Sequence, residues 1–186
     1  MWFDRWKSVM RSYDYSQREG VEELSRERFA QLSVILTEKL ADLSIDLVVG
    51  IARAGLLTAT VVACGLRREI YPVRVTRRVD DVVSFEHPVW KVDAPPAVEG
   101  KAVAVVDEIA DTGETLAIVA DRVSEIGAER TVTASLIAHS WAEPAPEVVA
   151  LVTDALVIFP WDKHVYVESR WQVHPELVRA LGLQGR

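Results

Sequence analysis

The 186-residue chain has little of several features that mark particular protein classes. It contains one cysteine, Cys64, so it can form neither an internal disulfide nor a zinc site built on paired cysteines. Cys64 lies in an apolar helical pattern, where we expect a buried small residue. No apolar run approaches the roughly 20 residues of a membrane span. The N-terminus is too charged for a secretory signal, so we expect a cytoplasmic protein without a membrane partner.

Basic residues are also scarce. Lys and Arg number 21 against 28 Asp and Glu, which gives a net charge of −7. A general nucleic-acid binder normally presents a basic face, so no nucleic-acid partner is expected. What the chain does have is 49% apolar residues, enough for one domain with a substantial core.

Predicted strands and helices alternate along the chain, and the strands are rich in Val and Ile without polar alternation. This pattern is typical of an α/β fold in which helices flank a central, mainly parallel five-stranded sheet. We expect helices over 21–43, 54–66, 115–126 and 175–181, and strands over 46–51, 70–75, 102–106, 132–138 and 155–159. Ligands of such sheets bind outside the carboxyl ends of the strands.

A long irregular segment, 76–100, interrupts the alternation. Loops of this length within a compact domain are usually functional or disordered. Two short apolar runs within it, 82–85 and 89–92, could pair as a hairpin. The preceding strand contains Pro72, which suits an edge position or the start of a paired segment.

The strand over 102–106 leads into two acids, Asp107 and Glu108, and then into a turn and a helix. Two acids at the end of a strand can accept hydrogen bonds from the vicinal hydroxyls of a ribose. In the turn, Gly113 permits close backbone approach, and the amides at the helix N-terminus converge on a phosphate. Asp111 lies between these two sites and could act as a base. The Asp-Thr-Gly sequence alone also suits a plain helix cap, but the complete run favours a ligand site.

The segment 105–115 resembles the signature of type I phosphoribosyltransferases, which bind phosphoribosyl pyrophosphate (PRPP). The shared pattern is an apolar strand, two acids, two variable residues and Asp-Thr-Gly-x-Thr. The resemblance implies that Asp107 and Glu108 hold the ribose hydroxyls, with Glu108 also near Mg²⁺. It makes Asp111 the proton acceptor that faces the incoming base. It further implies a 5′-phosphate cradle composed of Ala110, Asp111, Thr112, Gly113, Glu114 and Thr115.

A second segment, 49–56, resembles the pyrophosphate loop of the same family. The resemblance implies that Ala52, Arg53, Ala54 and Gly55 bind pyrophosphate, where Arg53 supplies a fixed positive charge. Ala54 stands where many relatives have a glycine. The segment 76–100 falls where the family has its mobile catalytic loop. Arg77 at its base is either a further pyrophosphate ligand or, with Arg78, part of a solvated pair beside Asp80 and Asp81.

The segment Phe159-Pro160-Trp161-Asp162 resembles the hood of the xanthine-guanine branch. Trp161 would then lie near the base, and Asp162 near the pyrophosphate and indirectly near the metal. Leu156 replaces the stacking aromatic residue of that branch, so Phe159 or Trp161 takes this role. His139 stands where the branch has a lysine that recognises the 6-oxo group of a purine. Alternatively, His139 is a surface loop residue.

Together these motifs imply a single phosphoribosyltransferase domain over 1–186, with a core over about 46–140. Residues 155–186 and the N-terminal segment would form a small hood. The expected reaction transfers the phosphoribosyl group of PRPP to a 6-oxopurine (hypoxanthine, guanine or xanthine) with Mg²⁺ as cofactor. The resemblance also implies a homodimer or a higher homo-oligomer. Two alternatives stay open: a PRPP-sensing regulator on the same fold, and a transferase for a non-purine base.

Overall fold

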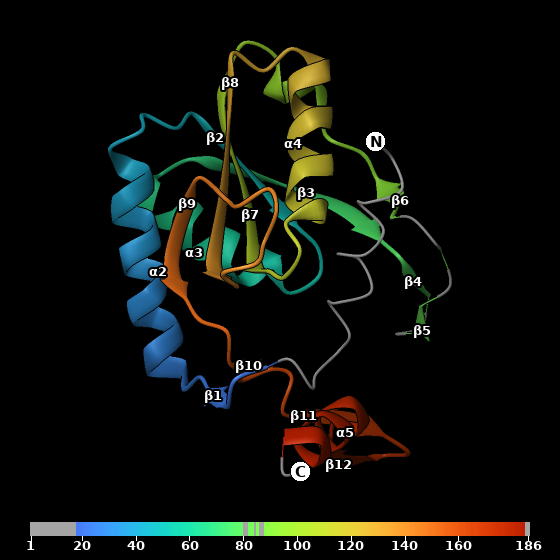
Figure 1. The fold of residues 1–186 in the computed structure, drawn as a ribbon. Coiled ribbons are helices and arrows are strands. Elements are labelled where there is room, and N and C mark those ends of the chain that lie inside the picture. Colours follow the sequence, from blue (N-terminus) through green and yellow to red (C-terminus); the bar gives the residue numbers. More distant parts are fainter. Residues whose placement is uncertain (1–17, 80–81, 84, 86–87, 185–186) are drawn as a thin grey trace. The chain divides into compact units, whose positions relative to one another are not determined.

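A computed structural model describes residues 18–79, 82–83, 85 and 88–184 (Figure 1). The chain divides into two compact units, which we describe separately. The sheet unit comprises Leu32–Val152, and the hood unit comprises Met1–Gln31 together with Thr153–Arg186. The first 17 residues of the predicted hood, and Asp80 and Asp81, lie outside the described residues.

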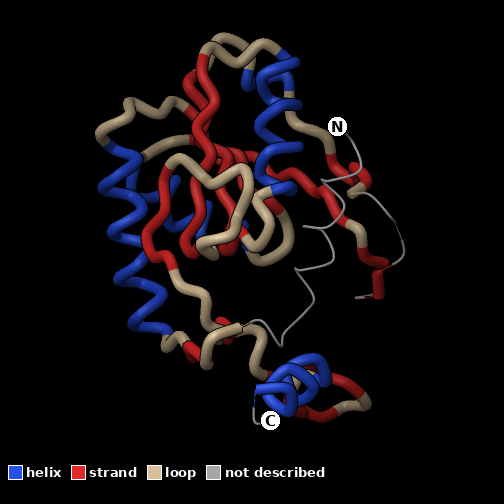
Figure 2. Tube along the Cα trace, in the orientation of Figure 1, coloured by secondary structure: helices blue, strands red, loops and turns tan. Residues whose placement is uncertain are grey.

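A six-stranded sheet with the order β6-β3-β2-β7-β8-β9 forms the centre of the sheet unit (Figures 1 and 2). The strands are β2 (Leu47–Ile51), β3 (Glu69–Thr76), β6 (Val89–Val92), β7 (Ala102–Ala110), β8 (Arg130–Ala138) and β9 (Val148–Val152). Five strands are parallel, and β6 pairs antiparallel with β3 at one edge. The prediction of an α/β fold with a mostly parallel sheet is confirmed.

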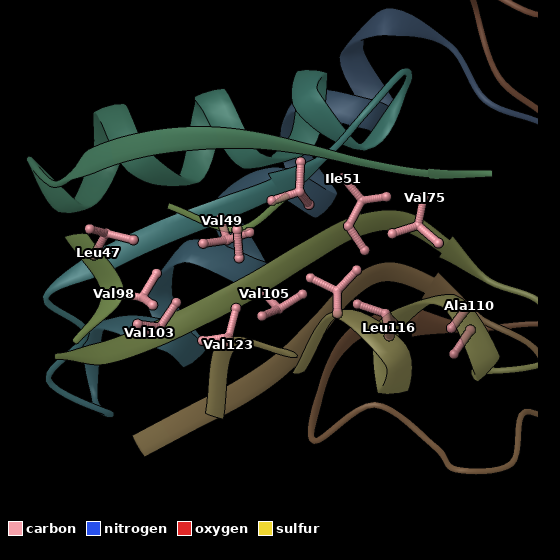
Figure 3. Packing of buried hydrophobic residues seen from close by; sticks show 14 of the residues in the cluster. Leu47, Val49, Ile51, Val75, Val98, Val103, Val105, Ala110, Leu116 and Val123 are labelled. Atoms are coloured by element: carbon pink, nitrogen blue, oxygen red, sulfur yellow. The ribbon is translucent and has the colours of Figure 1, made fainter. Parts of the chain in front are cut away.

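Helices cover both faces of the sheet. Helix α3 (Gly55–Leu66) and helix α4 (Glu114–Ile126) lie on opposite faces (Figure 1). Leu116, Val119 and Val123 form the buried stripe of α4. They pack on strand residues such as Val49 and Val105 in a common apolar cluster (Figure 3). This packing stabilises the sheet and holds the N-terminus of α4 at its carboxyl edge.

The fifth parallel strand differs from the prediction. Residues 148–152 form it, whereas the predicted run, 155–159, contains a shorter strand of the hood unit, β10 (Leu156–Ile158). Strand β10 pairs in parallel with β1 (Val21–Glu23). Both candidate runs are short and apolar, and the choice between them depends on long-range pairing with β8.

The first helix is also shorter than predicted. Helix α2 spans Arg26–Ala41, and the predicted first turn forms β1 instead. The hydroxyl of Ser25 accepts a hydrogen bond from the amide of Arg28 at 3.0 Å, so Ser25 caps the helix and fixes its start. Its residues Leu32, Leu36 and Leu40 are buried.

The segment 76–100 contains short strands, but not the predicted hairpin. Val82–Val83 (β5) pairs with Arg78–Val79 (β4), whereas β6 joins the main sheet. A short helix, η3 (Pro96–Val98), follows. Pro72 lies within β3, and the β6 partners of that strand begin only at Arg74, so Pro72 occupies an edge position as its missing N–H requires. Mobility of the segment stays a prediction.

Among its described residues, the hood unit also contains a hairpin of β11 (His164–Val167) and β12 (Arg170–Val173), followed by helix α5 (Pro175–Gln184). No helix among the described residues is long and apolar enough to cross a membrane. The expected burial of Cys64 is wrong, because its side chain is exposed on α3.

Candidate functional site at the carboxyl edge of the sheet

Four neighbouring parallel strands, in the order β3-β2-β7-β8, end at one edge of the sheet. The segments that follow them contain most of the predicted site residues. Arg77 follows β3, and residues 52–55 follow β2. The acids and the turn 111–113 lie at the end of β7, and His139 follows β8. The topology therefore brings together segments that are far apart in the sequence.

The first loop, residues 52–54, connects β2 to α3. The Ala52 amide donates to the carbonyl of Val73 on β3 at 2.8 Å, which extends the strand pairing into the loop. The Ala52–Arg53 peptide bond is cis. Ala54 has φ −73° and ψ −28°, an ordinary helical conformation, so this position does not require glycine. Arg53 is exposed at the edge of the sheet.

Gly55, the first residue of α3, lies directly against the acid pair. A Cβ atom at this position would lie 3.0 Å from the Cα of Asp107 and 3.1 Å from Oε2 of Glu108. It would also collide with Oδ1 of Asp107. A side chain at position 55 would therefore displace the carboxylates, and only glycine lets the helix approach them this closely.

Asp107 and Glu108 are part of β7, which extends four residues beyond the predicted strand, 102–106, to Ala110. The amide of Glu108 donates to Oδ1 of Asp107 at 2.9 Å. Burial of the Asp107 carboxyl raises its pKa well above the ordinary value, and the negative charge of Glu108 raises it further. This pair would gain from any ligand that brings hydrogen-bond donors or positive charge.

The second loop, residues 111–113, connects β7 to α4. Gly113 has φ +82°, a left-handed conformation that favours glycine. The hydroxyl of Thr112 accepts from the amide of Glu114 at 3.4 Å. A Cβ atom on Gly113 would meet the backbone of Pro144, 3.1 Å from its carbonyl carbon. The turn is therefore packed beneath the segment that follows β8.

That segment also brings His139 and Trp141 to Asp111. Nε2 of His139 lies 3.9 Å from Oδ1 of Asp111, and Nε1 of Trp141 donates to the same oxygen at 3.4 Å. The rings of His139 and Trp141 stack, with centroids 4.5 Å apart and planes inclined by 17°. His139 is only 4% exposed, so the alternative of a surface loop position is wrong.

Trp141 was not among the residues predicted from the sequence. Its only sequence signal is a large aromatic residue two positions after the strand-ending His139, in a loop with two prolines. The contact with Asp111 bridges 30 positions in the chain and depends on the pairing of β7 with β8.

The predicted base-stacking residues lie in the hood unit. The rings of Phe159 and Trp161 stack, with centroids 4.9 Å apart and planes inclined by 11°. Phe29 meets Trp161 edge-on at 5.2 Å. Phe159 is buried, and Asp162 is exposed. The amide of Asp162 donates to the carbonyl of Phe159 at 3.0 Å, which closes the turn after β10.

Within the described part of the chain, no group of three or more His, Cys, Asp or Glu side chains is arranged to hold a metal ion. Asp107 and Glu108 form a close pair of carboxylates. Magnesium commonly binds through one or two carboxylates together with phosphate oxygens of a substrate. The pair therefore fits an ion that arrives with a phosphorylated ligand.

The sheet topology and these loops place the protein among open parallel α/β proteins, whose ligands bind at the carboxyl edge of the sheet. Residues 20–168 match the family model described as the phosphoribosyl transferase domain. The chain therefore belongs to the phosphoribosyltransferase family, of type I, as the two motifs predicted.

Solved structures of purine enzymes are similar to this chain. A purine phosphoribosyltransferase from Pyrococcus horikoshii has 26% identity and a TM-score of 0.70, over 80% of this chain and 98% of its own. The xanthine-guanine-hypoxanthine phosphoribosyltransferase of Helicobacter pylori has 17% identity and a TM-score of 0.63, over 77% and 93%. An adenine phosphoribosyl transferase from Trypanosoma brucei has 16% identity and a TM-score of 0.53, over 68% and 65%. No curated protein matches the sequence.

Proposed function

We propose that the protein transfers the 5-phosphoribosyl group of PRPP to a 6-oxopurine and releases pyrophosphate. The observation that carries this proposal is the contact between Gly55 and the Asp107–Glu108 pair. Residues 52–55 therefore lie next to the acid pair, which supports the binding of one PRPP molecule by both segments. Family membership supports the same reaction class.

Three groups of residues would hold PRPP. Asp107 and Glu108 accept hydrogen bonds from the ribose hydroxyls, which offsets the cost of burying the Asp107 carboxyl. The amides and hydroxyls of 110–115 bind the 5′-phosphate at the N-terminus of α4. Residues 52–55 bind the pyrophosphate at the N-terminus of α3, with Arg53 and Arg77 as fixed positive charges.

Magnesium fits this arrangement. Glu108 would lie near the ion, whose ligands would be mainly PRPP oxygens and water. The motif resemblance also assigns Asp162 an indirect role at the metal. When bound, the ion supplies positive charge that offsets the charge of the leaving pyrophosphate.

In the reaction, the bond between the anomeric carbon and the pyrophosphate oxygen breaks and a bond from that carbon to a ring nitrogen of the base forms. The transition state resembles an oxocarbenium ion. The proton of the attacking nitrogen passes to the Asp111 carboxylate, which is 27% exposed and so accessible at the edge of the sheet. Pre-positioned amides and Arg53 supply electrostatic stabilisation.

The preference for a 6-oxopurine rests on His139. An imidazole N–H can donate to a 6-oxo oxygen, whereas the 6-amino group of adenine would place a donor against a donor. Trp161, whose ring stacks on the buried Phe159, would provide an aromatic surface for a purine. Similar structures include a xanthine-guanine-hypoxanthine enzyme and an adenine enzyme, and the test below distinguishes these two classes of base.

The test is a panel of bases assayed for pyrophosphate release with PRPP and Mg²⁺. We expect turnover with hypoxanthine, guanine or xanthine, poor turnover with adenine, and loss of turnover when EDTA is added. Asp107→Asn combined with Glu108→Gln is the matched inactive control, since both changes keep the side-chain shape. Efficient adenine use would contradict the 6-oxo preference. PRPP binding without turnover of any base, orotate and uracil included, would favour a PRPP-sensing regulator.

We also propose a homodimer or a higher homo-oligomer, on the resemblance to the family. Light scattering at several protein concentrations tests this part. A monomer at every concentration that supports full activity would contradict it.

A further inference from the structure

The segment 139–144, which follows β8, is attached to the turn 110–112 at three successive points. The bonds run from His139 N to Ala110 O (3.1 Å), from Trp141 Nε1 to Asp111 Oδ1 (3.4 Å) and from Glu143 N to Thr112 O (2.9 Å). Alternate residues of one segment thus bond to consecutive residues of the other. The backbone of Pro144 also packs against Gly113.

The bond from Trp141 differs from the other two. They join backbone groups and would form with almost any side chains, whereas this bond joins two side chains. Its acceptor is Asp111, the proposed proton acceptor of the reaction. An N–H donor at 3.4 Å holds one carboxylate oxygen of Asp111 in place.

The ring of Trp141 makes a second contact, with the proposed base-recognition residue. It stacks on His139 at 4.5 Å, and the His139 side chain is only 2% exposed. A buried ring that stacks on an indole loses its freedom to turn. The direction of its ring nitrogens is therefore set before a base arrives, which lowers the cost of binding.

We propose that Trp141 is a positioning residue that fixes Asp111 through its N–H and His139 through its ring. This inference rests on the proposed function, because it assigns a partner to each of the two residues that would face the base. Two parts of the Trp141 side chain would have different effects on the reaction. The N–H acts on proton transfer, and the ring acts on base recognition.

Two substitutions separate these effects. Trp141→Phe keeps a ring over His139 but has no donor for Asp111, so we expect kcat to fall about fivefold with the base KM within about twofold. Trp141→Gln can still donate to Asp111 but has no ring, so we expect the base KM to rise about fivefold with kcat within about twofold. The preference for 6-oxopurine over adenine should narrow only in the Gln variant.

The affinity for PRPP, measured by calorimetry without base, should stay within about twofold in both variants, because Trp141 acts on the base side. Trp171→Phe is the control, since this tryptophan is 70% exposed in the hood unit. Unchanged kinetics in both variants, or equal falls in kcat that accompany weaker PRPP binding, would overturn the inference. A wild-type protein that turns over no base would instead overturn the proposed function itself.

Discussion

The loops 52–54 and 111–113 precede helices α3 and α4 at the same edge of the sheet. At the start of each helix lies a glycine, Gly55 or Gly113, with no room for a side chain. Gly55 is crowded by the carboxylates of Asp107 and Glu108, whereas Gly113 is crowded by the backbone of Pro144. The first loop is thus fitted to charged groups that would bind a ligand, and the second to a neighbouring backbone segment. Under the proposed function, the first glycine would serve mainly ligand binding and the second mainly the fold.

The largest expected effect is on the second loop. Gly113→Ala should lower the free energy of unfolding by about 2 kcal/mol or more, because it places a side chain at φ +82° and presses it against the Pro144 backbone. Chemical denaturation measures the change. Gly100→Ala is the matched control, since Gly100 has φ +65° with no atom within 4 Å of its Cβ position. Equal losses of unfolding free energy in the two variants would show that the contact with Pro144 does not contribute to the effect.

The first loop should respond differently to the same change. Gly55→Ala should weaken PRPP binding about tenfold or more, which corresponds to about 1.4 kcal/mol, because the new methyl group displaces the Asp107 carboxylate. Its free energy of unfolding should fall by less than that of Gly113→Ala, because Gly55 has no left-handed φ and alanine favours the helix. Calorimetric titration and denaturation together test this split. A severe loss of stability with unchanged PRPP affinity would show that Gly55, like Gly113, serves the fold and not PRPP binding.

Removing the charge of Asp107 should raise stability while it weakens PRPP binding. The pKa of this carboxyl is raised in the folded protein, so the folded state binds the proton more tightly than the unfolded state. Its contribution to stability is therefore lost as the pH rises from the ordinary value of 3.8 through the raised pKa. Asp107→Asn should melt at a higher temperature than wild type at neutral pH, and this difference should shrink in acid.

Thermal melts between pH 4 and pH 8 measure the effect, with Asp121→Asn on the exposed surface of α4 as the control for general charge. A variant that melts below wild type at neutral pH would contradict the raised pKa.

The smallest effect is expected at Ala54, where many relatives have glycine. Its backbone is helical, so Ala54→Gly should only add freedom to the unfolded chain and cost about 0.4–1 kcal/mol. PRPP affinity and turnover should not change. A marked gain in either would show that the loop needs more backbone freedom than the helical conformation of Ala54 indicates.

The sheet unit was largely predictable because its signals are local. The Val-rich strands and the amphipathic pattern of α4 each decide the type of their own element. The start of α2 was also local, since Ser25 before a charged first turn is a capping signal, but the longer apolar periodicity over 21–43 concealed it. The fifth strand was not local. Two short apolar runs, 148–152 and 155–159, follow one another in the sequence. Only pairing with β8 decides which of them joins the main sheet.

In the candidate site, the loops were predictable but their neighbours were not. Glycine, acidic and hydroxyl residues at strand ends indicated two ligand-binding turns. Local sequence could not show that Gly55 touches Asp107, or that Trp141 reaches Asp111, because both contacts join segments through the order of the strands. The burial of His139 follows from the same packing.

The central claim is that the two loops bind opposite ends of one PRPP molecule, and calorimetry with the two halves of the ligand tests it most directly. Arg53→Gln should weaken the binding of magnesium pyrophosphate about tenfold and leave ribose 5-phosphate within about twofold. Thr115→Val should weaken the binding of ribose 5-phosphate about tenfold and leave magnesium pyrophosphate within about twofold, because it removes one hydroxyl from the phosphate turn. Both should weaken intact PRPP. Wild-type protein that binds none of the three ligands, or variants that weaken both halves equally, would contradict the account.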